Sequence, residues 1–252
     1  MAKVRKNIQL EGTIDGINYY RQKGVKELIA RKSGGGFNGE AIKTKANMEP
    51  VRQTGSEFGR VSRFVKLFKE GLAPLLPENK ITDFHSRLMG LFMAIKASDV
   101  TSERGCRTVE TGLLTEHGYS TLLGYSVFDS KALMKDFYRI VAFDASKSVV
   151  VCSRIGQARL VFPKGATMVR FQAALLTVDF DQEFTALSLS ESVLFSKQML
   201  SSFELGIPDT GVAERGLRFV LFLVSFMEPN GTDYRRIPGK NGYYLEVVGC
   251  RL

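Results

Sequence analysis

The most apolar stretch of this 252-residue chain is Phe219-Val220-Leu221-Phe222-Leu223-Val224, which Phe226 and Met227 extend. A strand with one face in water alternates apolar and polar residues, so an unbroken apolar run predicts a strand that is buried on both faces. One face belongs in a sheet core, and the other is covered either by the chain's own helical region or by another subunit. The core or interface positions that we expect are Phe219, Leu221, Phe222 and Leu223.

Most of the sequence around this run is strand-like. Short turn-forming segments such as Pro163-Lys164-Gly165 and Asn230-Gly231 separate the stretches, and no strand–helix–strand alternation is visible. This pattern predicts an antiparallel β-sandwich over residues 101–252, with either immunoglobulin-like or jelly-roll connections. The expected strands span residues 139–145, 148–155, 158–162, 167–180, 184–190, 217–227 and 242–249.

Residues 49–100 change to a helical period. An apolar stripe recurs in steps of three and four, and we expect Ser56 to cap the helix and Gly71 with Pro74 to end it. A second helix is predicted from residue 82 or 83 to about residue 98, so that the pair forms a helical hairpin. The stripe consists of Phe58, Val61, Val65, Phe68 and Leu72.

Residues 1–48 form a third segment. Between residues 7 and 32 the pattern predicts a three-stranded meander with turns at Asp15-Gly16 and Lys23-Gly24, followed by a glycine-rich, flexible arm. A meander of this size needs a partner surface for stability. The fold class is therefore α+β, with an N-terminal β-meander, a helical hairpin and a C-terminal antiparallel sandwich.

The positive charge of the chain is concentrated in its first third. Residues 1–80 contain 16 Lys and Arg against 8 Asp and Glu, whereas residues 81–252 contain 19 against 18. A basic segment on a nearly neutral body indicates contact with an acidic partner, which is a nucleic acid, a membrane surface or an acidic face of a neighbouring subunit. The candidate residues for this contact are Arg21, Lys23, Arg31, Lys32, Arg60, Arg63, Lys66 and Lys69.

No pattern of reactive residues predicts an enzyme. The two histidines, His85 and His117, belong to no metal or catalytic spacing, and the glycine-rich segment 33–39 lacks the Lys-Ser/Thr of a phosphate-binding loop. The three cysteines are widely spaced, which favours small buried hydrophobes over a zinc site. Asp179 and Asp181 indicate a solvated turn, with a cation site as the alternative. We expect no cofactor, no metal and no small-molecule substrate.

The first residues are basic but no apolar segment follows them, so we expect no standard signal peptide. No apolar stretch reaches the roughly 20 residues that a membrane helix needs. We therefore expect synthesis in the cytoplasm, which also suits a component of a phage-like or extracellular assembly.

Both halves of the chain contain short motifs, namely Gly12-x-x-Asp15-Gly16-x-x-x-Tyr20, the Lys23-Gly24 turn, Arg31-Lys32, Gly55-Ser56-Glu57-Phe58-Gly59, Pro163-Lys164-Gly165-Ala166-Thr167 and Val178-Asp179-Phe180. Together these motifs resemble a family of small uncharacterised proteins of Bacteroidota and their mobile elements. The resemblance implies only a layout, namely a basic N-terminal region, a helix pair and a β-sandwich.

These observations predict a structural subunit that self-assembles into a filament, lattice or phage-like particle through its N-terminal arm and its sandwich edges. Strand addition would supply main-chain hydrogen bonds in such an assembly. The alternative is a nucleic-acid-associated protein that uses the basic N-terminal region for weak backbone contacts.

Overall fold

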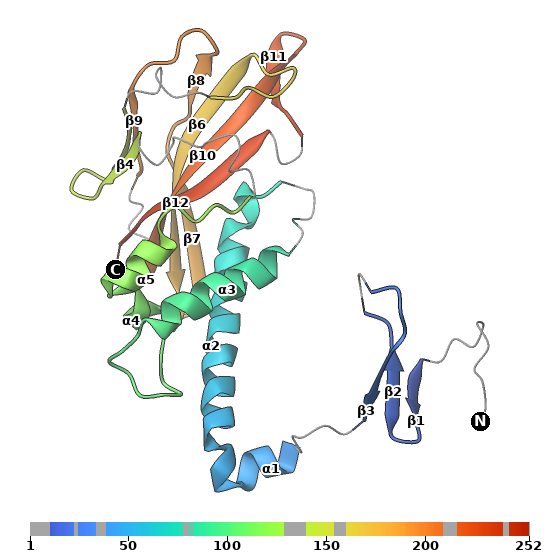
Figure 1. Cartoon of the computed structure of the whole chain (residues 1–252). Helices are drawn as coiled ribbons and strands as arrows, with labels where there is room; N and C mark the ends of the chain where they lie inside the picture. Colours follow the sequence, from blue (N-terminus) through green and yellow to red (C-terminus); the bar gives the residue numbers. More distant parts are fainter. Residues whose placement is uncertain are drawn as a thin grey trace. The chain divides into compact units, whose positions relative to one another are not determined.

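The computed structural model describes residues 11–22, 25–33, 39–77, 81, 83–128, 140–153, 160–208, 216–238 and 242–251. The chain divides into two compact units, Met1–Gln53 and Thr54–Leu252. The division falls inside the long helix α2, so each unit is described by itself. Figure 1 labels the helices and strands.

The first unit contains the three-stranded meander that the sequence predicts. Strands β1 (Gly12–Ile14), β2 (Ile17–Tyr20) and β3 (Ile29–Lys32) pair antiparallel in the order β1-β2-β3. Asp15 and Gly16 connect β1 and β2 with φ values of 48° and 74°, as a type I′ turn requires. The predicted Lys23-Gly24 turn lies outside the described residues.

The arm after the meander was expected to be flexible, but its described part is helical. It contains α1 (Gly39–Thr44) and the 3-10 turn η1 (Ala46–Met48). Arg52 holds this segment together, because its guanidinium donates to Ile42 O at 2.6 Å and to Lys45 O at 3.0 Å. These bonds satisfy carbonyl groups that the end of a short helix leaves without partners.

Helix α2 (Glu49–Leu72) begins seven residues before the predicted cap Ser56. Pro50 sits in its first turn, where a missing N–H costs nothing, so the helix can start there. The turn η2 (Ala73–Leu75) follows α2, and helix α3 (Phe84–Ala97) matches the predicted second helix. Figure 1 shows α3 running across α2.

The apolar stripe of α2 is buried except at its first position. Phe58 exposes 52% of its surface, which contradicts the prediction. Phe64, which was not predicted to be part of the stripe, is buried. The Phe64 ring packs edge-on against Phe92 of α3 at 4.8 Å, and Phe68 packs likewise against Phe219 at 5.0 Å. These contacts join both helices to the run at residues 219–224.

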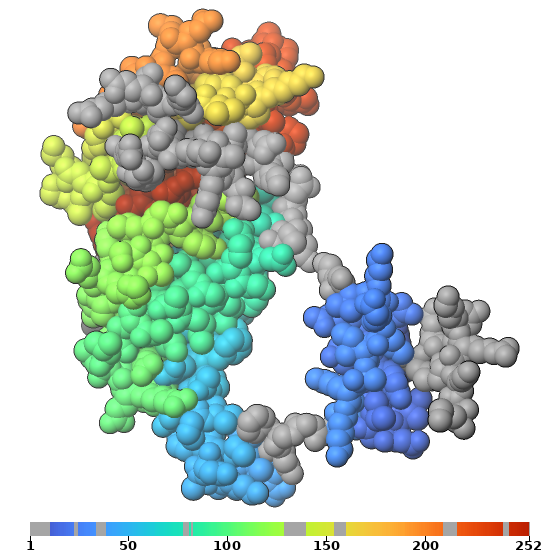
Figure 2. All heavy atoms as spheres, viewed as in Figure 1, coloured from blue at the N-terminus to red at the C-terminus, as the bar shows by residue number. Residues whose placement is uncertain are grey.

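Two short helices, α4 (Val109–Leu113) and α5 (Glu116–Leu122), were not predicted. Each begins at a threonine side chain: Thr108 accepts a hydrogen bond from Thr111 N, and Thr115 accepts one from Gly118 N. Both helices pack against α3. Figure 2 shows the atoms of this helical region, in cyan to green, as one continuous packed mass.

The body of the second unit is a six-stranded antiparallel sheet. Strands β10 and β6 pair along their length at its centre, and the path runs β11-β10-β6-β7, with β12 also beside β10 and β8 also beside β6. The strands are β6 (Met168–Asp179), β7 (Phe184–Leu189), β8 (Val193–Ser196), β10 (Leu217–Asn230), β11 (Asp233–Arg236) and β12 (Tyr243–Arg251).

A second, three-stranded sheet packs on one face of the larger sheet. Its order is β4-β5-β9, and its strands are β4 (Val141–Asp144), β5 (Val149–Cys152) and β9 (Phe203–Gly206). Val150, Cys152 and Leu205 of the small sheet share a buried cluster with Phe171 and Phe222 of the large one. The structure is therefore α+β with a β-sandwich, which confirms the predicted fold class.

The run at residues 219–224 is buried on both faces within the chain. Phe219, Leu221 and Leu223 lie in the cluster with the helices, whereas Val220, Phe222 and Val224 lie in the cluster with the small sheet. None of these six side chains exposes more than 5% of its surface. Of the two covers that the sequence left open for the outer face, the chain's own helices are the one observed.

Some strand predictions were wrong in detail. Residues 160–162, the described part of an expected strand, are not in a strand, and β8, β9 and β11 were not predicted. Strand β11 is exposed throughout and all its residues except Tyr234 are charged, so it lacks the apolar pattern of a strand and depends on its pairing with the end of β10. Cys106 was expected to be buried but is exposed, whereas Cys152 is buried.

Candidate functional site

The exposed face of the N-terminal meander is the first candidate site. The strand register places Ile14, Ile17, Tyr19 and Ala30 on one face, with Lys32 at its corner. Ile14 exposes 47% of its surface and Ile17 exposes 38%, and no described residue of the three strands is buried. We call this surface the meander face. It is apolar and has no cover among the described residues.

The opposite face of the meander is mixed, because Tyr20 and Ile29 lie on it beside polar and basic residues. Thr13, Asn18 and Arg31 lie on it, and the guanidinium of Arg31 stands 5.3 Å above the centre of the Tyr20 ring. Arg21 and Lys32 are exposed, and Arg21 pairs with Glu11 at 3.3 Å. Lys23 lies outside the described residues. Strand β3 thus carries one basic side chain on each face of the meander, Lys32 on the meander face and Arg31 on the opposite face.

The four basic residues predicted on α2 do not form a single open surface. Arg60 is half-buried and donates to Cys106 O at 2.9 Å, to Ser56 Oγ at 3.1 Å and to Gly105 O. Arg63 lies 5.5 Å from the centre of the Phe180 ring, and Lys66 pairs with Glu70 at 3.9 Å. Lys69 is half-buried. At least three of these cations already have partners within the chain.

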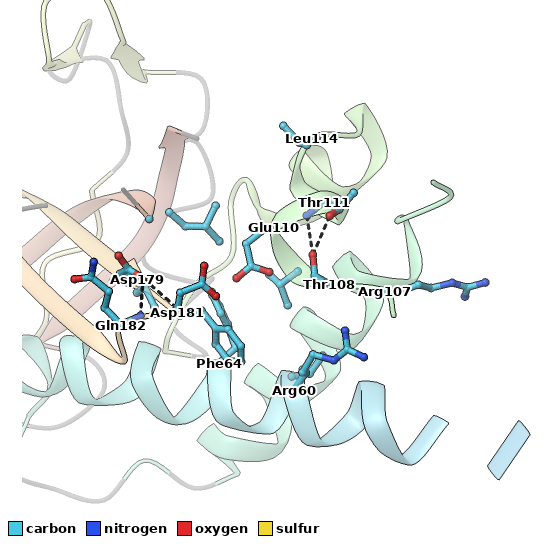
Figure 3. A pocket seen from close by; sticks show the side chains of 16 residues that line it. Arg60, Phe64, Arg107, Thr108, Glu110, Thr111, Leu114, Asp179, Asp181 and Gln182 are labelled. Carbon is cyan, nitrogen blue, oxygen red and sulfur yellow. Dashed lines mark hydrogen bonds between the residues drawn. The ribbon is translucent and has the colours of Figure 1, made fainter. Parts of the chain in front are cut away.

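A pocket of about 660 Å³ lies where α2, the α4 segment and the β6–β7 turn meet. Figure 3 shows Arg60 and Phe64 on α2, Glu110 on α4, and Asp181 on the turn, with the two carboxylates facing the space between. The Arg107 side chain points away from this space. The floor is apolar, because Val61, Phe64 and Leu217 line it.

Asp179, a polar residue in the lining of this pocket, forms hydrogen bonds within the chain. Asp179 Oδ1 accepts from Asp181 N at 3.0 Å and from Gln182 N at 2.9 Å, which closes the β6–β7 turn. Asp179 is therefore a buried turn residue and not a solvated one. Among the described residues no three His, Cys, Asp or Glu side chains are placed to hold a metal ion together. His85 and His117 are both exposed.

The sheet edge beside this turn is acidic, a feature that the sequence analysis missed. Residues 171–196 contain four Asp and Glu and no Lys or Arg. Of these, Asp181, Glu183 and Glu191 are exposed, and they flank β7, the last strand on its side of the sheet path. Phe184 exposes 37% of its surface and Leu189 exposes 42%. We call β7 with its flanking acidic residues the β7 edge.

Comparisons of the chain with protein-family models, with curated proteins and with solved structures give no match. The resemblance noted in the sequence therefore stays a prediction, as do the expected absence of catalytic activity and the expected cytoplasmic synthesis. Within the part of the chain that the structure describes, none of the helices has the length and apolar character of a membrane span.

Proposed function

We propose that the protein is a structural subunit that self-assembles head to tail, with the basic N-terminal unit of one copy docking on the β7 edge of the next. The observation that carries this proposal is the uncovered meander face. Ile14 and Ile17 lie side by side on it, next to the Asp15-Gly16 turn, and are more than one-third exposed. A three-stranded sheet without a covered apolar face is marginally stable, so the meander gains stability when a second surface covers it.

The main chain of the β7 edge is suited to pair with a strand of the docking N-terminal unit. Its outer side pairs with no described strand, so it offers the row of N–H and C=O groups that accepts an added strand. Strand addition supplies affinity through main-chain hydrogen bonds and register through alternate side chains. The exposed Phe184 and Leu189 add apolar surface beside that row.

The charges of the two surfaces are complementary. Residues 1–53 contain 11 Lys and Arg against 5 Asp and Glu, and residues 171–196 contain only acidic charges. Arg63 is one cation beside this edge, and its guanidinium lies over the Phe180 ring at 5.5 Å from the ring centre. A contact between two different surfaces of identical chains does not close on itself unless the rotation between copies allows a ring, so it produces filaments or rings.

A charge-reversal experiment tests the proposal. Sedimentation velocity and negative-stain electron microscopy of the full-length wild type should show concentration-dependent polymers that shrink as salt rises. The double variant Asp181→Lys/Glu191→Lys should stay monomeric, as should Arg31→Glu/Lys32→Glu, and a mixture of the two should associate again. The control Glu103→Lys/Glu204→Lys changes two exposed carboxylates outside the β7 edge and should assemble as the wild type does.

Two outcomes would contradict the proposal. A wild type that stays monomeric at every concentration would show that the meander face is not an assembly surface. If the wild type instead binds nucleic acid with a steep salt dependence, and loses this binding in Arg31→Glu/Lys32→Glu without any change in oligomeric size, these basic residues serve the nucleic-acid function. The stacked pair of Arg31 and Tyr20 is the observation that favours this second function.

A further inference from the structure

Strand β12 places one carboxyl group in an otherwise apolar layer. Successive side chains of a strand point to opposite faces, and Leu245 and Val247 of β12 join the core under the helices. Tyr244 and Val248 join the core between the two sheets, so Glu246 points to that side as well. Its partner across the ladder is Phe222, which is 1% exposed.

A pocket of about 230 Å³ opens at this carboxyl group. Glu246 is its only ionisable lining residue among those described, and the rest of the lining includes Leu123, Val141, Phe222 and Val248. The pocket is open to solvent, because Leu123 in its lining exposes 39% of its surface and Glu246 and Val248 are only partly buried.

Gly124 forms the rim of the pocket with a backbone that favours glycine. Its φ is 75°, and a Cβ atom there would lie 3.7 Å from Glu246 Oε1. The chain is fixed on both sides of this glycine, because Gly124 N donates to Val247 O at 2.9 Å and Val127 N donates to Leu245 O at 2.9 Å. The carboxyl group therefore sits in a formed pocket with a rigid rim.

We propose that this pocket binds a small organic ammonium ion, whose charged head pairs with the Glu246 carboxylate and whose apolar body packs on Val141, Phe222 and Val248. Glu246 is partly buried, and a carboxylate withdrawn from water is stabilised by a partner of opposite sign, which the described residues do not supply in the pocket. The volume sets the ligand's size, since a dry protein cavity of about 150 Å³ accommodates benzene. A cyclic or branched amine of similar size fits this space. The inference does not depend on the proposed assembly.

Binding should be linked to pH. Burial raises the pKa of Glu246 to about 7, so near neutral pH the group is only partly ionised. An ammonium ion pairs with the ionised form and should bind more weakly as pH falls below 7. At pH 5 the ionised fraction, and with it the affinity, should be roughly 100-fold lower than at high pH.

The test uses the full-length protein with cyclohexylammonium chloride as the probe. Calorimetric titration and thermal melts at pH 8 and pH 5 should give saturable binding with a raised Tm at pH 8 and roughly 100-fold weaker binding at pH 5. Cyclohexanol, which has the same body without the charge, should bind at least ten times more weakly at pH 8. Glu246→Gln should respond weakly and equally to both compounds at both pH values.

The matched control is Glu204→Gln, an exposed carboxyl group on β9. It should bind cyclohexylammonium as the wild type does. The proposal is wrong if the wild type shows no saturable binding at pH 8, if cyclohexanol binds as well as the ammonium ion, or if Glu246→Gln keeps the wild-type affinity. Glu246→Gln should fold, because its amide has the shape of the carboxyl group and carries no charge, and a melt without ligand checks this.

Discussion

Lys96 Nζ lies 2.5 Å from Glu57 Oε2, and neither side chain exposes more than 8% of its surface. Glu57 Oε1 also accepts a hydrogen bond from Gly105 N at 2.7 Å. Burial raises the pKa of Glu57, but the bonds from Lys96 and Gly105 outweigh it, and the pKa lies below its ordinary value. One carboxylate thus joins α2, α3 and the loop that precedes α4.

Lys96→Met should destabilise the protein by about 3–5 kcal/mol, because it leaves the Glu57 carboxylate buried without its cation. The double variant Glu57→Leu/Lys96→Met should recover most of this loss, since a buried ion pair can often be replaced by apolar residues of similar volume. Lys66→Met, which removes a cation exposed over 74% of its side chain, is the control. Urea unfolding of the three variants measures the differences. Equal stability of Lys96→Met and Lys66→Met would show that the buried pair has no special role.

Asp99 should make the stability depend on pH in the acidic range. Burial raises its pKa, but hydrogen bonds from Ser102, Thr108 and Thr101 outweigh it and hold the pKa at about 2. Because the folded-state pKa is lower than the ordinary 3.8, the stabilisation is complete above about pH 4 and disappears as pH falls toward 2.

The variant Asp99→Asn isolates this effect from the other carboxyl groups. It should be less stable than the wild type at pH 7, since Asp99 Oδ2 accepts from Thr108 N and an amide NH₂ cannot. The difference between the two proteins should shrink as pH falls from 4 to 2. Denaturant unfolding at intervals of half a pH unit measures it, and a difference that stays constant over this range would contradict the assignment.

The two glycines Gly59 and Gly71 of α2 should respond oppositely to alanine. At Gly71 a Cβ atom would collide with Leu176 Cδ1 and lie 3.2 Å from Thr185 Cβ, because here the helix touches the sheet. At Gly59 a Cβ atom would meet nothing within 4 Å. Gly71→Ala should therefore destabilise by roughly 1–3 kcal/mol, and Gly59→Ala should stabilise by about 0.5–1 kcal/mol. Thermal melts compare the two, and a Gly71→Ala protein as stable as Gly59→Ala would refute the close approach.

The start of the α2 stripe shows what a hydrophobic pattern can and cannot predict. Val61, Phe68 and Leu72 are buried as the period indicates, but the buried row begins at Glu57 and not at Phe58. An apolar residue was the natural choice for a buried position. Lys96, which is 39 positions away in the sequence, stabilises the buried Glu57 by pairing with it. No local sequence pattern predicts such a pair.

The missed helices α4 and α5 have a different cause. Glycine lowers helix propensity, which hides these helices in the sequence. A Cβ atom at Gly112 would collide with Ile95 O and one at Gly118 with Gly112 O. These glycines allow short helices to pack closely, which depends on tertiary contacts. The threonine caps Thr108 and Thr115 were the available local signal. The Glu246 pocket was not predictable either, because it needs α5, β4 and β12 to come together.

Phe222 and Phe58 provide the last prediction, since the sequence assigned both to buried positions and only Phe222 is buried. Phe222 is 1% exposed and stacks on Phe171, with ring centres 5.9 Å apart, in the layer between the two sheets. A carboxylate in this layer costs several kcal/mol, and the whole stability of a domain is only about 5–15 kcal/mol. Because the layer lies within one chain, Phe222→Asp should be insoluble or unfolded as a monomer.

Phe58→Asp is the matched control, because it places the same charge on a side chain that is 52% exposed. It should fold and melt within a few degrees of the wild type, because a substitution at an exposed position usually changes the free energy of unfolding by about 0.5 kcal/mol or less. Circular dichroism melts and sedimentation of both variants give the comparison. If Phe222→Asp folds normally and loses only its ability to assemble, the layer lies between copies and not within the chain. If it keeps both the melting temperature and the size of the wild type, the position is exposed, and β10 is not the centre of the fold.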